Sequence, residues 1–351
     1  MATFRIAVIG GDGIGPEVID ETVRVLEKAA RHDQASFDWN HLPWSSTRFK
    51  QTGEMVPDNG WDVLARHDAI LFGAVGLPDV PDQIPVHSLL LPMRRKFDQY
   101  VNLRPAYLFD GVTSPLANKA PGSIDMLVYR ENTEGEYAGN GGRVHRGLPE
   151  EVATETSVFT RTGVERIHRF AFELAQKRKR KHLTLVTKSN AQRHGMVLWD
   201  EIFYEVAKRY PDVQTQRILV DAVTTNMVLK PWSLDTLVAS NLHADILSDL
   251  AAALTGSLGI APTANLNPER RFPSMFEPIH GSAFDITGKG IANPVATFWT
   301  ASMMLEHLGE IDVAVRLMKA VEAVTARKLL TPDLGGEATT AIITEAVCDA
   351  L

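Results

Sequence analysis

The sequence predicts an α/β protein whose strands pair in parallel. Short apolar segments of strand length alternate with longer segments in which apolar residues recur at helical spacing. The chain has 351 residues, 44% of them hydrophobic, which suffices for a large core and for two domains. Composition marks no boundary between such domains, because the sequence has no repeat, low-complexity tract or obvious linker.

The first two elements are a strand at 4–9, "FRIAVI", and a helix that runs to about Arg31. Pro16 suits the first turn of this helix, where a backbone amide has no partner within the helix. The apolar face of the helix carries Val18, Ile19, Val23, Leu26 and Ala30.

The turn between this strand and helix has glycines at positions 10, 11, 13 and 15 and resembles a dinucleotide-binding fingerprint. That fingerprint requires glycines at i, i+2 and i+5. From Gly11 the third place is Pro16, and from Gly10 the second place is Asp12. The spacing therefore excludes a Rossmann loop.

Later segments continue the alternation. A buried strand at 69–76 ends in a second glycine-rich turn, and helices are predicted at about 162–177 and 194–209 and over most of the chain after residue 290. The remaining predicted strands are 124–131, 182–187, 216–223 and 236–240. The basic run at 177–181, "KRKRK", follows a helix, where cations complement the helix dipole, so we interpret it as a solvated helix end rather than a nucleic-acid patch.

Bulk properties exclude several classes of partner. The formal charge of −7 argues against nucleic acid and acidic membranes. No apolar run reaches the ~18–20 residues of a membrane helix. Cys348 is the single cysteine, so disulfides within the chain and thiolate metal sites are excluded. The start of the sequence has no signal-peptide pattern, and we expect a cytoplasmic location.

Charged residues stand at positions where a plain core strand would not carry them. They are Arg94, Arg104, Arg130, Lys188, Asp221, Asp245 and Asp249. Asp221 is expected at a strand end. Each alone has an ordinary structural explanation. The aspartate pair, four apart on one helix face, destabilises a helix by a few tenths of a kcal/mol and so indicates a cation between the carboxylates. An oxygen-only ligand set favours Mg²⁺ or Mn²⁺.

At these residues the chain resembles the β-decarboxylating dehydrogenases, the isocitrate/isopropylmalate dehydrogenase-like family, over nearly its whole length. The motifs that carry the resemblance are "GDGIGPEV", "GAVGLPD", "NLRP", "RENTEGEY", "TKSN", "DILSDL", "EPIHGSAFDITGKGIANP" and "TPDLGGEATT". "RENTEGEY" with "FDQYVNLRP" is most similar to the tartrate/D-malate dehydrogenase (decarboxylating) branch, because isopropylmalate enzymes tend to read R-E-L-T-G-G-I-Y.

The resemblance implies a fold and an assembly. The expected fold is an isopropylmalate dehydrogenase-like two-domain α/β fold with a large mixed sheet flanked by helices, not a Rossmann fold. Residues 1–100 with 254–351 would form the larger, cofactor-binding domain, and residues 101–253 the smaller dimerisation domain, with the active site in the cleft between them. Lys188 and Asp221 would come from the neighbouring subunit of a homodimer.

The resemblance also assigns roles in an oxidative decarboxylation of a (2R)-hydroxy dicarboxylate such as D-malate, with tartrate as a second candidate. Three arginines would hold the substrate carboxylates, Lys188 would be the base and Tyr137 the acid. The metal ligands, for Mn²⁺ or Mg²⁺, would be Asp221, Asp245 and Asp249. Three aspartates and a dianion balance three arginines and a divalent ion, as a buried site requires. The arginines that hold the substrate carboxylates would be Arg94, Arg104 and Arg130.

The expected cofactor is NAD, and the family leaves room for a monovalent cation such as K⁺. An acidic residue can accept hydrogen bonds from ribose hydroxyls, whereas relatives that use NADP carry Lys-Tyr where this chain has Asp285 and Ile286. The implied cofactor-binding residues are Gly13, Ile14, Gly73, Val75, Asn190, Glu277, His280, Gly281, Ser282, Ala283, Asp285, Ile286 and Asn293.

Substrate choice is expected to depend on His87, Ser88 and Leu91, just before the first arginine. The first two could bind a hydroxyl group, whereas Leu90 and Leu91 would equally suit an alkyl group. Two alternatives therefore remain: an isopropylmalate dehydrogenase, and an inactive regulatory subunit of the same family, against which the presence of the catalytic residues argues. His243, Ala244 and Phe284 depart from the family pattern beside the metal and adenosine sites.

Overall fold

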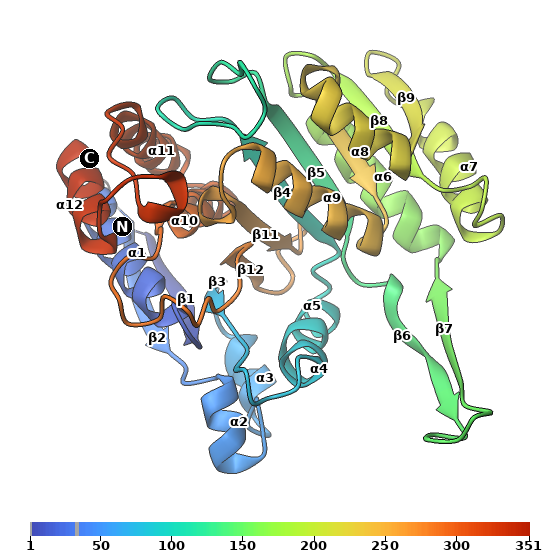
Figure 1. Ribbon diagram of the computed structural model, residues 1–351, viewed down its shortest axis with the longest axis horizontal. Helices are drawn as coiled ribbons and strands as arrows, with labels where there is room; N and C mark the ends of the chain where they lie inside the picture. Colours follow the sequence, from blue (N-terminus) through green and yellow to red (C-terminus); the bar gives the residue numbers. More distant parts are fainter. Residues whose placement is uncertain (1, 32–34) are drawn as a thin grey trace.

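The computed structural model describes residues 2–31 and 35–351. Its main feature is a ten-stranded mixed sheet with helices on both faces (Figure 1). From one edge to the other the strands are β2 (Ala35–His41), β1 (Ala2–Gly11), β3 (Ala69–Ala74), β12 (Ser274–Pro278), β11 (Pro262–Leu266), β4 (Val101–Tyr107), β5 (Asp125–Glu131), β10 (Thr236–Ala239), β8 (His182–Thr187) and β9 (Gln214–Leu219). The mixed α/β fold expected from the family resemblance is confirmed.

The parallel pairing predicted from the alternation of elements holds only in the outer parts of the sheet. β2, β1, β3 and β12 are parallel to one another, as are β5, β10, β8 and β9. At the centre β11 and β4 run antiparallel to their neighbours. The sheet is continuous where the segment 101–253 meets the rest of the chain, because β4 pairs with β11 there.

Helices cover the sheet in groups. α1 (Gly15–Ala30), α10 (Val295–Leu308), α11 (Ile311–Ala326) and α12 (Thr340–Ala350) pack together beside β1, β3 and β12. α6 (Arg161–Ala175) and α7 (Gly195–Ala207) pack beside β5, β10 and β8, while α8 (Val220–Leu229) and α9 (Asn241–Leu254) contact each other and β9, β8, β5 and β4. The shorter helices α2 (Ser46–Thr52), α3 (Gly60–Leu64), α4 (Gln83–Pro85) and α5 (Leu91–Lys96) lie at the lower end in Figure 1.

Side-chain alternation along β1 explains why both faces of this sheet are covered. Ile6 and Val8 enter the largest core cluster, which extends through the segment 101–253 to Trp199. Ala7 and Ile9 point to the other face and join a second cluster around Trp44. Successive residues of a strand face opposite sides, so a strand buried on both faces is apolar throughout.

One prediction of local structure was wrong. The predicted strand 216–223 ends at Leu219, and α8 begins at Val220, so Asp221 lies in the first turn of a helix rather than at a strand end. The basic run directly follows α6 and is exposed at Lys177, Lys179, Arg180 and Lys181, as predicted for a solvated helix end. Arg178 is the exception, because it pairs with the fully buried Asp235 at 2.6 Å. Desolvation of Asp235 requires such a partner.

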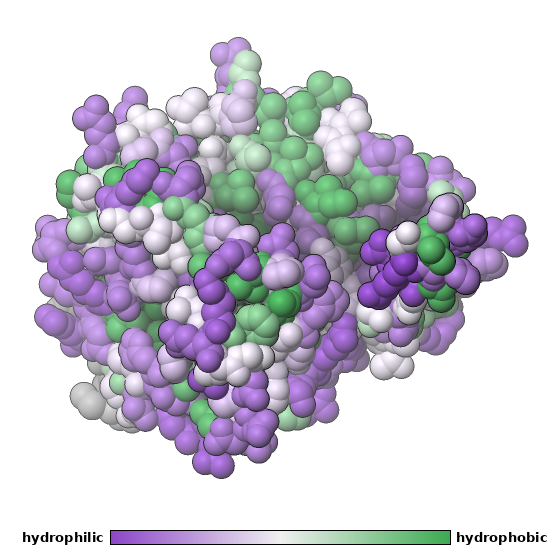
Figure 2. All heavy atoms as spheres, turned by 60° about the horizontal axis from the view of Figure 1, so that its bottom comes forward, coloured by the Kyte–Doolittle hydropathy of each residue, from purple (hydrophilic) through white to green (hydrophobic). Residues whose placement is uncertain are grey.

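A two-stranded antiparallel arm, β6 (Gly135–Val144) and β7 (Val152–Val158), projects from the body of the molecule (Figure 1). It exposes the apolar side chains of Val144, Leu148 and Val152. Hydrophilic side chains cover most of the face seen in Figure 2, with smaller groups of hydrophobic ones between them. Within the described ranges, no helix is both long and apolar enough to span a membrane.

Candidate active site

Two buried arginines and one aspartate form the centre of the candidate site. Arg104 of β4 and Arg130 of β5 lie on neighbouring strands, and α9 passes over them. The Arg104 Nη1 atom lies 3.1 Å from Asp245 Oδ1, and Arg130 Nη1 contacts the same oxygen. Arg104 also donates to Ser248 Oγ at 2.7 Å, and Arg130 Nε donates to Asn241 Oδ1 at 2.8 Å.

Tyr137 joins this centre from β6. Its hydroxyl donates to Asp245 Oδ2 at 2.6 Å, and the Arg130 guanidinium lies over the Tyr137 ring, 5.2 Å from the centroid. Arg104, Arg130 and Tyr137, from three different strands, thus meet at the carboxylate of Asp245. The residues predicted as substrate ligand, metal ligand and acid are neighbours in space.

Arg94 approaches from α5 and has a different partner. Its Nη2 atom donates to Glu277 Oε1 at 3.2 Å, and Glu277 also accepts from Asn265 at 2.8 Å. The Arg94 Nε atom is buried without a partner. Arg94, Arg104 and Glu277 line a hollow of about 180 Å³, here called the arginine hollow, together with Gly73, Val75, Leu90, His280 and Gly281.

The charges of this cluster balance before any ligand is bound. Arg94, Arg104 and Arg130 carry three positive charges, and Asp245, Asp249 and Glu277 carry three negative charges. A divalent ion and a dicarboxylate together add no net charge. The site can therefore take both ligands as a pair without an uncompensated buried charge.

Burial and the neighbouring charges shift the ionisation of these groups. Burial would raise the pKa of the Asp245 carboxyl, but the guanidiniums of Arg130 and Arg104 outweigh burial and hold that pKa below its usual range. Burial lowers the pKa of Arg130 to about 10, with repulsion from Arg104 as a second cause. Burial and the hydrogen bond to Asp245 raise the pKa of Tyr137, so its hydroxyl keeps its proton at neutral pH.

Asp249 is the more accessible aspartate. It lies four residues after Asp245 on the same face of α9, its side chain is 58% exposed, and its closest cation is Arg104 at 3.7 Å. Burial of part of the side chain, with the Asp245 charge, raises the pKa of Asp249. The two carboxylates supply only oxygen donors, which suits Mg²⁺ or Mn²⁺.

The other two predicted groups form a separate pair. Lys188, directly after β8, donates to Asp221 Oδ1 at 2.6 Å. Among the residues that the structure describes, no three His, Cys, Asp or Glu side chains are close enough to hold one metal ion. Within one chain, therefore, Asp245 and Asp249 lie together on α9, whereas Asp221 lies elsewhere, beside Lys188.

A second hollow, of about 410 Å³, is lined by six of the thirteen predicted cofactor-binding residues. We call it the Asp285 hollow; its lining includes Ile14, His280, Ala283, Asp285, Ile286 and Asn293. His280 also lines the arginine hollow, so the two adjoin. His280 Nε2 and the neighbouring Ser282 Oγ are buried without hydrogen-bond partners, which is consistent with a polar ligand at this place.

The glycine-rich turn of the first strand packs against this region. Gly13 has φ +63°, and a Cβ atom there would lie 2.0 Å from the Ser282 carbonyl oxygen, to which the amide of Ile14 donates at 2.9 Å. A Cβ at Gly73 would lie 2.3 Å from the Gly10 carbonyl oxygen. A side chain does not fit at Gly13 or Gly73, because another backbone segment passes too close. This close approach requires glycine at both positions whether or not a ligand binds there.

Several predicted residues lie apart from these hollows. Asn190 is exposed, two residues after Lys188. His87 borders a different hollow, with Tyr137 and the β6–β7 arm, and Ser88 is exposed beside it. Leu90, rather than the buried Leu91, lines the arginine hollow, because the segment Val86–Leu90 is a π-helical turn that shifts the register before α5.

The residues that depart from the family pattern have ordinary structural places. His243 and Ala244 are buried on the inner face of α9, and burial lowers the pKa of His243 despite the opposing charge of Glu136. Neither contributes to the Asp245–Asp249 face. Phe284 is 40% exposed beside the Asp285 hollow.

Sequence reasoning missed two residues that hold the arginines. Asn241 and Ser248 flank Asp245 at positions i−4 and i+3, on the same face of α9, and bind Arg130 and Arg104. The helical spacing within "SNLHADILSDL" was sufficient to place them there. Glu277, a predicted cofactor-binding residue, is also the ion-pair partner of Arg94.

Comparisons with known proteins show to which family the chain is similar. The family model described as isocitrate/isopropylmalate dehydrogenase matches residues 5–351. The chain is 62% identical to a probable tartrate dehydrogenase/decarboxylase of Agrobacterium vitis over 100% of this chain and 98% of the relative. It is 52% identical to the decarboxylating D-malate dehydrogenase of Escherichia coli K12, over 99% and 98% of the two chains. The crystal structure of isocitrate dehydrogenase from Methylococcus capsulatus superposes with a TM-score of 0.88 at 37% identity, covering 99% of each chain.

These findings first define a class: the protein is an oxidoreductase, a decarboxylating dehydrogenase of hydroxy acids of the tartrate/D-malate dehydrogenase type. The sequence-based expectation for this branch is confirmed. The chain belongs to the isocitrate/isopropylmalate dehydrogenase family.

Proposed function

We propose that this protein catalyses the NAD- and Mn²⁺- or Mg²⁺-dependent oxidative decarboxylation of a (2R)-hydroxy dicarboxylate. D-Malate, converted to pyruvate and CO₂, is the proposed substrate, and tartrate is a second one. The observation that carries the proposal is the meeting of Arg104, Arg130 and Tyr137 at Asp245, beside Arg94. The names of the relatives from Agrobacterium vitis and Escherichia coli support this choice of substrates.

The arginines bind and orient the substrate in this proposal. Arg94 has an unpaired buried Nε donor, and Arg104 and Arg130 present guanidiniums whose fork geometry matches carboxylates. Both strand arginines pair with Asp245. Substrate carboxylates replace Asp245 as their partner, which leaves the aspartate for the metal ion.

Two side chains move protons. Lys188 takes the proton of the C2 hydroxyl, and Tyr137 gives a proton to C3 after the C3–C4 bond has broken and CO₂ has left. The raised pKa of Tyr137 keeps that proton available. When bound, NAD⁺ accepts the hydride of C2, and the divalent ion stabilises negative charge on the substrate oxygens. Asp245 and Asp249 of one chain and Asp221 of another would hold the ion, and the Asp285 hollow would hold the adenosine part of NAD.

A homodimer with shared active sites is part of the proposal. Leu242 and Ile246 are exposed on α9, and Asp249 lies on the same helix face as these apolar side chains. Val228 and Leu229 are exposed apolar residues of α8, which packs against α9. A second chain that covers this surface would bring its own residues next to the aspartates. This would supply the missing third carboxylate and the lysine.

The test is NADH production from D-malate, L-tartrate, meso-tartrate and 3-isopropylmalate, with and without Mn²⁺ and with and without K⁺. We expect the highest kcat/KM with D-malate or a tartrate, and activity only with the divalent ion. A higher kcat/KM with 3-isopropylmalate would overturn the substrate assignment. Absence of NADH with every substrate would favour a regulatory subunit.

A further inference from the structure

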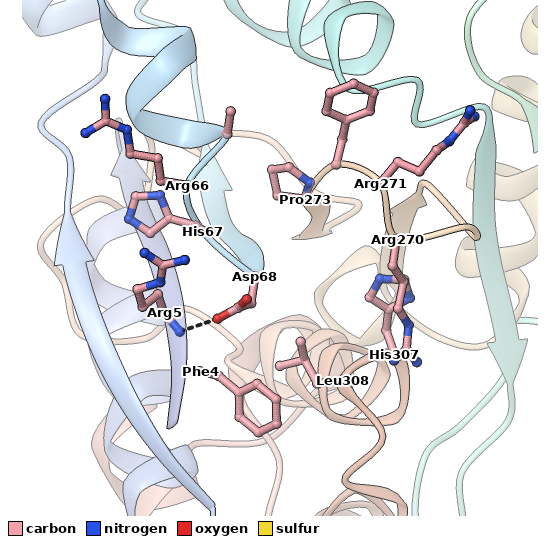
Figure 3. Close-up of a pocket in the computed structure, with 12 residues that line it drawn as sticks. Phe4, Arg5, Arg66, His67, Asp68, Arg270, Arg271, Pro273, His307 and Leu308 are labelled. Carbon is pink, nitrogen blue, oxygen red and sulfur yellow. Dashed lines mark hydrogen bonds between the residues drawn. The ribbon is translucent and has the colours of Figure 1, made fainter. Parts of the chain in front are cut away.

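A basic hollow of about 340 Å³ lies at the opposite end of the strands from the candidate active site (Figure 3). Arg5 belongs to the start of β1, Asp68 directly precedes β3, and Pro273 directly precedes β12. The arginine hollow uses the other ends of these parallel strands, at Ala74 and Glu277. The two hollows are therefore separated by the length of strands β3 and β12.

The lining of the basic hollow carries a net positive charge. Arg5, Arg66, Arg270 and Arg271 line it, and Asp68 is its single carboxylate, so four positive charges and one negative charge leave +3. The Asp68 carboxylate accepts a hydrogen bond from the backbone amide of Arg5 at 2.7 Å. The whole chain has a net charge of −7, so the positive charge of this hollow is opposite in sign to that of the chain.

Three of the four guanidiniums have no partner in the part of the chain that the structure describes. Within residues 2–31 and 35–351, the side chains of Arg5, Arg66 and Arg270 make no hydrogen bond or ion pair, whereas Arg271 lies 3.3 Å from Asp98. Arginine is a residue whose planar fork usually pairs with carboxylate or phosphate. Like charges gathered without a counter-ion repel one another, and a bound anion removes that repulsion.

The two walls of the hollow are held in place by the fold. In Figure 3 Arg5, Arg66 and His67 lie on one side and Arg270, Arg271 and His307 on the other. His67 is fixed by contacts of its ring nitrogens with Val63, Leu64 and Asn40. Asn267 accepts from the amides of Arg270 and Arg271 and so fixes the opposite turn.

His307 adds a neutral polar group to the second wall. Burial lowers its pKa to about 4, and the charge of Arg270 acts in the same direction. The ring lies 5.6 Å from the ring of Phe276. Leu308 and the partly exposed Phe272 supply apolar surface beside the charged groups.

We propose that the basic hollow binds a small polyanion that carries two or more phosphate or carboxylate groups. Guanidiniums on two walls can each hold one anionic group, so a ligand with separated charges bridges them. A volume of about 340 Å³ suits a small metabolite rather than a macromolecule. The proposal does not depend on the reaction at the arginine hollow.

The experiment is titration calorimetry of the full-length protein with inorganic pyrophosphate and with citrate, in buffer free of divalent ions. The test variant is Arg66→Gln/Arg270→Gln, which removes one unpaired guanidinium from each wall and leaves the candidate active site unchanged. Arg327→Gln is the matched control, because Arg327 is an exposed arginine outside the hollow with no side-chain partner among the described residues. Unfolding midpoints of all three proteins verify that they fold.

We expect at least a tenfold weaker affinity of the double variant for the anion that binds better, and unchanged affinity of the control. Tight binding of pyrophosphate alone identifies a phosphate ligand, and tight binding of citrate alone identifies a carboxylate ligand. Failure of both anions to bind the wild-type protein overturns the proposal. Equal affinity of the wild-type protein and the double variant also overturns it, because the binding then belongs to the arginine hollow.

Discussion

The hydroxyl of Tyr137 lies 2.6 Å from Asp245 Oδ2, while Arg104 and Arg130 bind the other oxygen of the same carboxylate. One aspartate thus links the proposed acid, two proposed substrate ligands and the proposed metal site. Its partners must change when substrate and metal bind. The hydrogen bond from Tyr137 can persist, because it uses an oxygen that the arginines do not contact.

Replacement of Tyr137 by phenylalanine removes the proposed proton donor and little else. Asp245 keeps both arginine partners, so we expect the free energy of unfolding to change by about 1 kcal/mol or less. Turnover should fall about 100-fold to 10,000-fold, the usual contribution of a positioned acid. Completion of the decarboxylation, the protonation of C3, should be impaired more than hydride transfer, because the acid acts after the oxidation and after CO₂ has left. Single-turnover assays of NADH and pyruvate measure the two steps, and equal loss in both would contradict the role.

Asp249→Asn tests the metal site with little structural disturbance. The Asp249 side chain is 58% exposed, and its nearest cation, Arg104, retains Asp245 as a closer partner. We expect unchanged stability and a Mn²⁺ affinity at least tenfold lower, measured as the Mn²⁺ concentration that gives half-maximal activity. Asp110→Asn, at an exposed aspartate far along the chain from α9, is the control. An unchanged Mn²⁺ requirement in the Asp249 variant would exclude Asp249 as a metal ligand.

The sequence was sufficient to place those residues whose geometry is local. The i,i+4 relation of Asp245 and Asp249 follows from helical periodicity, and the order of strand, turn and helix around Gly10–Gly15 follows from turn chemistry. The pairing of Arg94 with Glu277 could not be predicted in this way, because it joins residues 183 positions apart. The antiparallel centre of the sheet was missed for a similar reason, since β11 and β4 are brought together by the whole fold.

The position of Leu90 shows a second limit of sequence reasoning. The family resemblance placed the substrate contact on this segment and left Leu90 and Leu91 as equal candidates, whereas in the structure Leu90 lines the arginine hollow and Leu91 is buried. The π-helical turn at Val86–Leu90 changes the angular position of each side chain before α5. Proline residues at 85 and 92 frame this segment, but they do not specify the type of turn.

Lys188→Met should abolish oxidation, because no other group in the proposal removes the proton of the C2 hydroxyl. The shared site makes a sharper prediction. At a Mn²⁺ concentration that suffices for the wild-type protein but is too low for Asp249→Asn, Lys188→Met and Asp249→Asn should each be nearly inactive alone. A mixture of the two should then regain about a quarter of wild-type activity after subunit exchange, because half the dimers are mixed and each mixed dimer has one intact site. Absence of recovery, with mixed dimers verified by mass spectrometry, would place Lys188 and Asp249 in the same chain's site.

Cofactor choice should depend on Asp285 and Ile286, which line the same hollow. We expect the wild-type enzyme to prefer NAD, since the carboxylate repels a 2′-phosphate. Asp285→Lys/Ile286→Tyr should lower kcat/KM for NAD and raise it for NADP. Asp285→Asn is the control for loss of charge alone, and it should weaken the discrimination without reversing it. A wild-type preference for NADP would refute the assignment.

His168 should make the protein less stable in acid. It is fully buried on α6 against Trp199 and Phe203, neither ring nitrogen has a hydrogen-bond partner, and burial lowers its pKa from 6.5 to about 3. Between these two values the unfolded chain binds a proton that the folded chain does not, so the free energy of unfolding falls as the pH falls from 6.5 towards 3. At pH 5 the loss from this group is about 2 kcal/mol. His168→Phe keeps an aromatic ring at this position and removes the titration. Urea unfolding at pH 7 and pH 5 should therefore show a smaller loss of stability in the variant, by about 2 kcal/mol, and equal losses would mean that His168 is protonated in the folded protein or contacts water.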